Sequence, residues 1–178
     1  MKDFLRRIKL IDHLTTELEI SRNDFVNKLK EHVDDGGVGF LSDMFDVFSS
    51  GKNEFKGKVE YEGFKIKRKK RFFDMNMNLA IAEGKFIQRD QLLIIETEIN
   101  GFHKMFVPFY IFGIFLYPII LTSFLMTDNL EPNALLLTIP FLFLHAAFMF
   151  GIPYFVMRNS ARKMKYELER EFFYMTKK

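Results

Sequence analysis

The sequence of 178 residues contains no cysteine and no tryptophan. The absence of cysteine excludes disulfide scaffolds, cysteine-ligated zinc, iron–sulfur clusters and cysteine nucleophiles. The glycines at 36, 37 and 39 lack the Lys-Ser/Thr pair of a phosphate-binding loop, and neither H-E-x-x-H nor G-x-S-x-G occurs. We therefore predict no enzyme, no cofactor and no metal site.

Charge is missing from two long stretches in the second half of the chain. Residues 105–126 and 134–157 are 22 and 24 residues long and contain no Asp, Glu, Lys or Arg. Because about 20 apolar residues cross a bilayer core as a helix, the pattern predicts a transmembrane hairpin over 105–157. Two core helices of a soluble protein are the alternative, but the rest of this chain offers little surface to cover them.

The charges that flank these stretches predict their orientation. Residues 1–104 carry a net charge of +1, residues 127–133 carry −2, and residues 158–178 carry +4. Since loops rich in Lys and Arg stay on the cytoplasmic side, both termini are expected in the cytoplasm. The juxtamembrane basic residues are Lys104, Arg158, Arg162, Lys163 and Lys165.

One ionisable side chain, His145, lies within a predicted span. A titratable group at this depth is by default a hypothesis for a functional site, here a proton relay or a pore lining. The alternative is a neutral imidazole that forms a hydrogen bond with Thr122, with Ser123 or with a carbonyl freed by a proline. The second interpretation requires no function of the histidine.

The N-terminal part carries strand and helix signals in turn. Within 6–20 the even-numbered positions hold the apolar residues Ile8, Leu10, Leu14, Leu18 and Ile20, which predicts a half-buried strand, although a helix over 4–14 stays open. Ser21 and Asp24 resemble a capping box, so a helix is expected to begin at Ser21. The acidic and glycine residues at 34–37 predict its end.

A second short helix is expected over 39–48, and the apolar period then changes to two. Strands are predicted over 55–61, 64–67, 79–86 and 92–99. Consecutive strands joined by tight turns are typical of an antiparallel meander, whose apolar face must be covered. The two preceding helices are the expected cover, which predicts an α+β domain with a curved sheet or half-barrel.

The densest positive charge lies on one predicted strand. The run comprises Lys65, Lys67, Arg68, Lys69, Lys70 and Arg71. In a strand, alternate residues face opposite sides, so Lys65, Lys67, Lys69 and Arg71 would share a face. Contact with anionic lipid headgroups is one hypothesis and a solvated face is the other. Nucleic acid is disfavoured as a partner because the whole domain carries only +1.

Residues 158–178 predict an amphipathic helix. Apolar side chains at Ala161, Leu168, Phe172 and Met175 recur near helical spacing, and charged residues occupy the rest of the surface. Such a helix can extend the second span, lie on the bilayer surface, or pair with another copy of the chain. The sequence leaves these three alternatives open.

Residues 55–68, a second strand around Gly84 and the Phe-rich hairpin resemble a family of small bacterial membrane proteins of the Bacteroidota type. The shared pattern is F-x-G-x-[IV]-x-x-x-x-F-x-[IV]-x-R-R, and the resemblance covers about residues 15–126. Lys69 replaces the second Arg of the pattern, and Asn-Leu at 78–79 replaces a usual Asn-Pro. The resemblance implies a β-rich cytoplasmic domain, a two-span hairpin in the inner membrane, and no catalytic residues.

These features predict a multi-pass inner-membrane protein whose cytoplasmic domain is a sensor, scaffold or interaction module at the membrane surface. Its expected partners are the bilayer, anionic headgroups and other copies of the chain. The alternative is an oligomeric effector or pore-former of the phage-defence or toxin type, which requires an oligomer because two spans cannot enclose a pore. An enzyme hypothesis rests only on the Arg7–His13 spacing, which matches a loose ribonuclease pattern and arises readily by chance.

Overall fold

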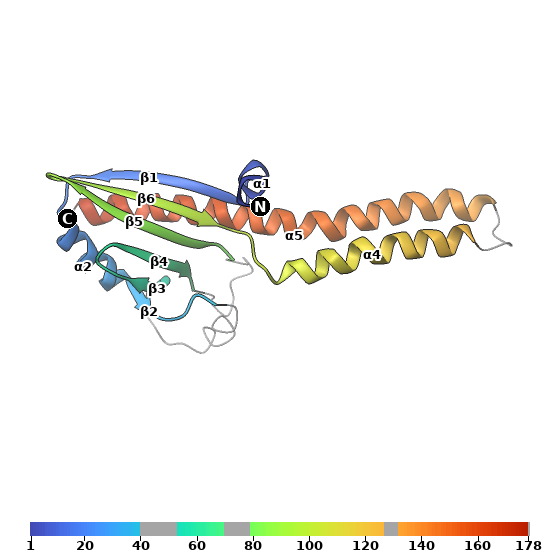
Figure 1. Cartoon of the computed structure of the whole chain (residues 1–178), viewed down its shortest axis with the longest axis horizontal. Helices are drawn as coiled ribbons and strands as arrows, with labels where there is room; N and C mark the ends of the chain where they lie inside the picture. Colours follow the sequence, from blue (N-terminus) through green and yellow to red (C-terminus); the bar gives the residue numbers. More distant parts are fainter. Residues whose placement is uncertain (40–52, 70–78, 127–131, 178) are drawn as a thin grey trace. The chain divides into compact units, whose positions relative to one another are not determined.

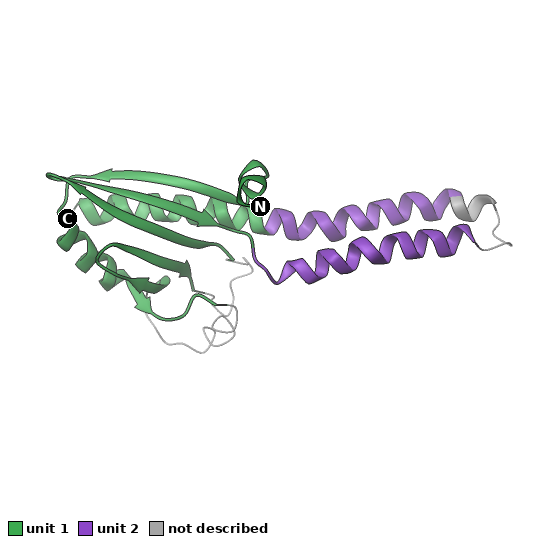
Figure 2. Cartoon of the chain, viewed as in Figure 1, with its two compact units in different colours: residues 1–102, 157–178 green, residues 103–156 purple. Residues whose placement is uncertain are grey.

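The computed structural model describes residues 1–39, 53–69, 79–126 and 132–177. The chain forms two compact units (Figure 2). The first contains residues 1–102 together with 157–178, and the second contains residues 103–156. The C-terminal segment, expected as a separate tail, therefore belongs to the same unit as the N-terminal domain.

The first unit is built on a six-stranded sheet (Figure 1). Across the sheet the strands are β1 (Ile11–Leu18), β6 (Leu92–Asn100), β5 (Ile81–Arg89), β4 (Gly63–Arg68), β3 (Phe55–Val59) and β2 (Val33–Asp35). All neighbours are antiparallel except β2 and β3, which are parallel. The predicted meander is confirmed from β3 to β6, whereas the sheet as a whole is mixed. It is open, with β1 and β2 at its two ends.

The N-terminal segment begins as a short helix, α1 (Lys2–Arg7), and continues into β1 only at Ile11. The prediction of one strand over 6–20 was therefore wrong at its start. Asp3 in the first turn and Arg6 in the last turn suit the helix dipole, and Leu5 is buried. A helix of six residues is too short to show a helical period of apolar residues, so the alternating pattern of the following strand dominates the prediction.

Helix α2 (Arg22–His32) begins where the sequence predicts it. The Ser21 hydroxyl accepts a hydrogen bond from the backbone N–H of Asp24, at 3.2 Å. The predicted end was wrong, because Asp34 lies in β2, which follows the helix directly. The carboxylate of Asp34 pairs with Lys69 and accepts a hydrogen bond from Asn53. The helix predicted over 39–48 lies outside the described residues from residue 40 onward.

The apolar face of the sheet is covered by α2 and by the C-terminal part of α5 (Pro132–Thr176), which runs beside the strands in Figure 1. The expectation that the two helices before the meander form the cover was therefore incomplete. The buried residues of α5 in the core are Ala161, Met164, Leu168, Phe172 and Met175. Their spacing of three or four residues places them on one stripe of the helix. The amphipathic segment thus extends the second apolar helix and buries its stripe in its own domain.

Phe172 lies at the centre of this core and is fully buried. Its ring packs edge-to-face against Phe25 of α2, with ring centroids 5.4 Å apart, and against Phe64 of β4 at 5.9 Å. Phe64 also lies over Gly84 of β5, where an added Cβ would meet the ring at 2.3 Å. One aromatic cluster therefore joins the two covering helices to the middle of the sheet.

Two contacts fix α5 to the sheet just after its apolar part. The Ser160 hydroxyl is buried and accepts hydrogen bonds from the backbone N–H groups of Leu79 and Ala80, at 2.7 and 2.8 Å. Gly101, directly after β6, lies so close to α5 that an added Cβ would meet the Met157 carbonyl oxygen at 2.5 Å. The chain segments before β5 and after β6 therefore both contact this turn of α5.

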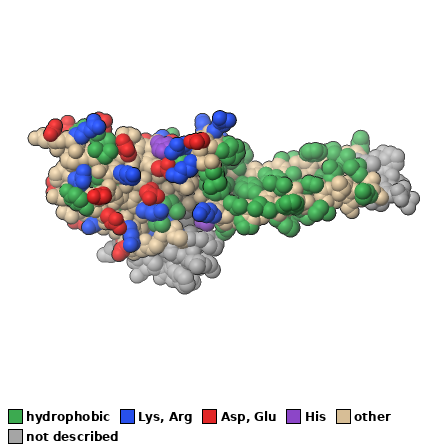
Figure 3. Space-filling view, in the orientation of Figure 1, with side chains coloured by type: hydrophobic (Ala, Val, Ile, Leu, Met, Phe, Trp, Pro, Cys, Tyr) green, Lys and Arg blue, Asp and Glu red, His purple; other side chains and the backbone are tan. Residues whose placement is uncertain are grey.

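The second unit consists of α4 (Phe106–Leu125) and the N-terminal part of α5. Gly113 of α4 lets the Phe150 ring approach to 2.6 Å of the position a Cβ would take. The Tyr110 hydroxyl donates a hydrogen bond to the Phe150 carbonyl oxygen at 3.3 Å. On the face that Figure 3 shows, many hydrophobic side chains lie at the surface of these helices. Both helices are long and apolar enough to cross a membrane.

Replacing Phe172 by Ala is expected to reduce the free energy of unfolding by about 3–5 kcal/mol, because the change leaves a cavity in the aromatic cluster. Phe173 is the matched control, since it is adjacent, 52% exposed and outside the core. Phe173→Ala should cost less than about 1 kcal/mol, including its contact with Lys177. Denaturant unfolding of the detergent-purified chain measures both. Equal losses would contradict the position of α5 in the core.

Gly101→Ala is expected to destabilise the protein by about 1–3 kcal/mol, because the methyl group would overlap the Met157 carbonyl. Gly36→Ala is the control, since the nearest atom to a Cβ there, on Lys56, is 3.9 Å away. Thermal unfolding should show a lower midpoint for the first variant only. A Gly101 variant as stable as the wild type would mean that this close contact is not needed.

Candidate functional site

The basic strand predicted as a lipid-binding surface is largely engaged within the protein. Lys65 and Lys67 lie on the face of β4 opposite to its core residues. The Lys65 ammonium pairs with Glu83 of β5 at 3.3 Å. Lys67 is 2% exposed and donates a hydrogen bond to the Gly39 carbonyl at 3.2 Å. Lys70 and Arg71 lie outside the described residues.

The other two described cations of this run pair with carboxylates. Arg68 points to the core side and forms an ion pair with Glu167 of α5, and Lys69 pairs with Asp34 of β2. Burial raises the pKa of Glu167 above its ordinary value, although the charge of Arg68 opposes this shift. These cations therefore join the meander to the helix and to the edge strand.

Three of the five juxtamembrane basic residues instead line a pocket of about 490 Å³. Its basic lining comes from Arg158, Arg162 and Lys165 of α5 and from Lys9, which precedes β1. The three α5 residues are separated by four and three positions, so they share one face of the helix. The sequence predicted these three but missed Lys9, which is far away in the chain. Lys104 and Lys163, the other two predicted residues, do not line this pocket.

Two carboxylates complete the lining of this pocket. Asp12 of β1 pairs with the Lys165 ammonium at 3.2 Å and also accepts a hydrogen bond from the His13 backbone N–H. Glu169 lies one helical turn beyond Lys165, beside the exposed ring of Tyr166. Four cations thus face two carboxylates, and the lining keeps an excess of positive charge. We call this site, between β1 and α5, the juxtamembrane pocket.

Lys9 reaches this pocket through an uncommon backbone conformation. Its φ is 58°, in the left-handed region that residues other than glycine rarely adopt. Its N–H donates a hydrogen bond to the Arg6 carbonyl at 2.9 Å, which closes the turn after α1. Such a conformation costs on the order of 1 kcal/mol for a side chain like lysine.

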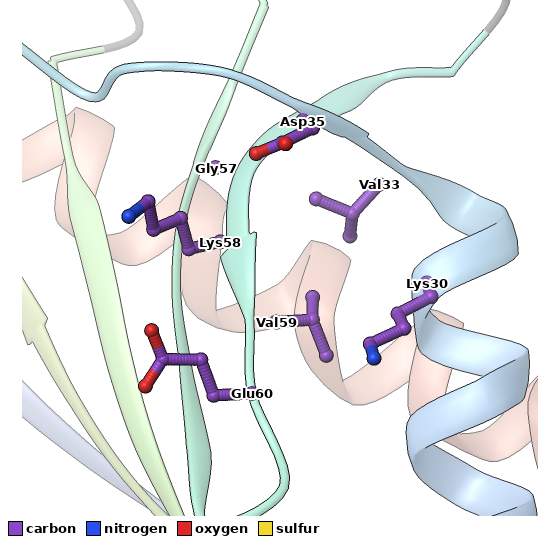
Figure 4. A pocket seen from close by; sticks show the side chains of 7 residues that line it. All are labelled: Lys30, Val33, Asp35, Gly57, Lys58, Val59 and Glu60. Atoms are coloured by element: carbon purple, nitrogen blue, oxygen red, sulfur yellow. The ribbon is translucent and has the colours of Figure 1, made fainter.

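A second pocket, of about 460 Å³, lies between α2, β2 and β3. Figure 4 shows Lys30 beside Val59, whereas the side chains of Lys58 and Glu60 point away from it. Asp35 lies at the far end of the pocket. The charged groups are of mixed sign and do not converge on one point, so this pocket shows no arrangement for a defined ligand.

A third pocket, of about 610 Å³, lies over β1, β6 and β5 and is lined by Glu83, Glu96 and Glu98 with Lys2 and His13. Within the described part of the chain, no group of three His, Asp or Glu side chains could hold a metal ion. Arg7, in α1, does not line this pocket, so the Arg7–His13 spacing finds no shared site here.

Glu98 in this third pocket fixes the N-terminal helix to the sheet. Its carboxylate pairs with Lys2 at 2.8 Å and with Arg6 at 3.2 Å. The hydrogen bond from Lys2 lowers the pKa of Glu98, burial opposes this, and the hydrogen bond from Arg6 lowers it further. The carboxylate therefore has a structural role between α1 and β6.

His145, the ionisable residue of the apolar helices, is paired within the second unit. The Tyr117 hydroxyl lies 2.8 Å from His145 Nδ1, and the Phe141 ring stacks on the imidazole. Thr122, a partner considered from the sequence, instead donates to the carbonyls of Pro118 and Ile119. The imidazole itself is exposed on the surface of the helices.

Comparison of the chain with protein-family models, with curated proteins and with solved structures finds no match. The resemblance of residues 15–126 to a family of bacterial membrane proteins therefore stays a prediction.

The lowered pKa of Glu98 predicts a pH-dependent contribution to stability. Because the folded pKa lies below the unfolded one, the stabilisation is present above the unfolded pKa and is lost as pH falls through the folded pKa. Glu98→Gln should lower the free energy of unfolding by up to about 1 kcal/mol at neutral pH. The variant and the wild type should converge as the pH falls through the folded pKa of Glu98. Glu96→Gln is the control, because Glu96 faces the same side and forms no ion pair with a described residue.

Proposed function

We propose that this protein is a two-span membrane protein whose first unit is an interaction module at the cytoplasmic surface of a bacterial inner membrane. The observation that carries the proposal is the exposure of the two apolar helices. In the most apolar window of α4 only 6% of the residues are buried, and in that of α5 none. Apolar surface of this extent is unstable in water, and a bilayer supplies the missing environment.

The path of α5 supports a module held at the membrane rather than on a free linker. The same helix contains the apolar segment and, further along, the stripe that fills the core of the first unit. Ser160 and Gly101 attach the sheet to α5 within one turn of Met157. The core stripe of the first unit and the apolar segment are therefore parts of one helix, with no separate linker between them.

The charges support the proposed side and partners. Residues 158–178 carry a net charge of +4 and the segment between the spans carries −2, which favours cytoplasmic termini. The inner leaflet of a bacterial membrane is rich in anionic lipid, which attracts basic residues close to its surface. The juxtamembrane pocket supplies four such residues. Anionic headgroups are therefore the partner of first choice, and catalysis is not part of the proposal.

An oligomeric effector or pore-former is the second candidate, and the observation that favours it concerns His145. The Tyr117 hydroxyl pairs with Nδ1 of its imidazole, but the ring is exposed near the middle of the apolar segment, where a second ring nitrogen without a partner would cost several kcal/mol in lipid. A neighbouring copy would relieve this cost. The mass of the detergent-purified protein, from light scattering corrected for bound detergent, separates the two functions: a ring-sized oligomer favours the pore-former, and a monomer or dimer favours the module.

The chain is suited to a topology experiment because it has no native cysteine. Single variants Glu60→Cys, Lys177→Cys and Asn129→Cys place one thiol in the first unit, one near the C-terminus and one between the apolar helices. A membrane-impermeant maleimide should label Asn129→Cys in spheroplasts, and the other two only after the membrane is disrupted.

The parent chain, which cannot react, measures the background of this labelling. After alkaline carbonate extraction, the protein should remain in the membrane pellet. Labelling of all three thiols in spheroplasts would overturn the proposed orientation. Release by carbonate would overturn the membrane spans themselves.

A further inference from the structure

We propose that the juxtamembrane pocket is a binding site for a phosphate group. On the basis of the proposed function, that phosphate belongs to the headgroup of an anionic lipid. A soluble phosphate ester would present the same chemistry, and the experiment below separates the two sources. The inference deepens the proposed function by naming a site and a ligand class.

The first argument is the arrangement of charge. Arg158 and Arg162 lie one turn apart on the same face of α5, with Lys165 one turn further. Lys9 comes from a different segment, the turn before β1. Arg recognises phosphate through paired N–H groups, whereas Lys contributes a compact charge. The pocket therefore combines cations of both kinds from two segments that are distant in the sequence.

The second argument is how the charge of the pocket is balanced. Asp12 is occupied by Lys165 and by the backbone of His13. Glu169 forms no ion pair with any described residue. The lining thus holds four cations and two carboxylates in a site of about 490 Å³, which is within the range of pockets that hold small ligands.

The third argument is the backbone of Lys9. A lysine held at φ 58° stores strain that a glycine at this position would not. Strained residues cluster at binding sites, where the surrounding structure holds a side chain in place for function. Here the residue in the left-handed conformation is also one of the cations that line the pocket.

The fourth argument is the distance of the basic residues from the end of the apolar segment along α5. Arg158 follows Met157, the last residue of the uncharged run, and Lys165 lies seven positions later. At about 1.5 Å per residue, the basic face extends roughly 10 Å beyond the apolar segment along the helix. The headgroup region of a bilayer adds a layer of several ångströms to each side of its hydrocarbon core. The cations thus begin where headgroup phosphates lie.

The experiment uses the full chain purified in a neutral detergent and measures the midpoint of thermal unfolding. Three probes are added in separate titrations: short-chain phosphatidylglycerol, phosphatidylcholine of the same chain length, and sn-glycerol 1-phosphate. A ligand that binds only the folded protein raises the midpoint with increasing concentration. We expect phosphatidylglycerol to raise it more than phosphatidylcholine does.

Three variants test whether the shift arises in the pocket. Arg162→Gln should weaken phosphatidylglycerol binding about fivefold, the effect of one basic residue near a membrane surface. Lys9→Gly should weaken binding similarly while the midpoint without ligand stays equal or rises, because glycine accepts the left-handed conformation. Glu169→Gln removes a repelling charge and should strengthen binding.

Arg170→Gln is the matched control. It removes the same charge from the same helix, but Arg170 is exposed, pairs with its neighbour Glu171, and does not line the pocket. Its titration should match that of the wild type. If Arg162→Gln and Arg170→Gln weakened phosphatidylglycerol binding equally, the binding would depend on the total charge of the helix and not on the pocket. That result would overturn the proposal.

The probes decide the source of the phosphate. A shift with phosphatidylglycerol alone supports the lipid headgroup, and a shift with sn-glycerol 1-phosphate alone supports the pocket but overturns the lipid. No shift with either, or an equal shift with phosphatidylcholine, overturns the pocket as a phosphate site. The unfolding assay in detergent tests only the phosphate site, and the cysteine labelling tests only the membrane topology. A negative result in one therefore does not decide the other.

Discussion

The structure of the first unit depends on the burial of one stripe of α5 against the sheet. Without Leu168 and Phe172, the apolar faces of β4, β5 and β6 would be covered only by α2, which is a short helix. A mixed sheet with one exposed apolar face is not stable in water. The stripe therefore decides that the sheet stays open, that the C-terminal segment is part of the domain, and that the domain is continuous with an apolar helix.

Charged residues, like the apolar stripe, form contacts between segments that are distant in the sequence. The basic run on β4 reads in the sequence as a surface, but Arg68 and Lys69 bind carboxylates that the fold brings to them, Glu167 and Asp34. These two residues of the run therefore form ion pairs within the protein. Three cations that follow the apolar segment of α5, Arg158, Arg162 and Lys165, instead line the juxtamembrane pocket together with Lys9.

The sequence predicts those features that local patterns determine. The period of two from residue 55 onward predicts the meander, Ser21 predicts the start of α2, and the uncharged runs predict the two apolar helices. Features that depend on distant contacts could not be predicted. The stripe at Ala161 to Met175 shows that an apolar face exists, but not whether a bilayer, a second copy or its own sheet covers it. That Lys9 and Arg158 line the same pocket likewise depends on the tertiary fold.

The order of segments along the chain has a consequence for biosynthesis. The strands of the first unit are synthesised before α4, but the helix stripe that completes their core comes after both apolar helices. A ribosome must therefore release the whole hairpin before the domain can close. Until then the sheet has an open apolar face that must be shielded from aggregation. Completion of the first unit thus has to wait for residues 157–178, and a chain that ends before them lacks a finished domain.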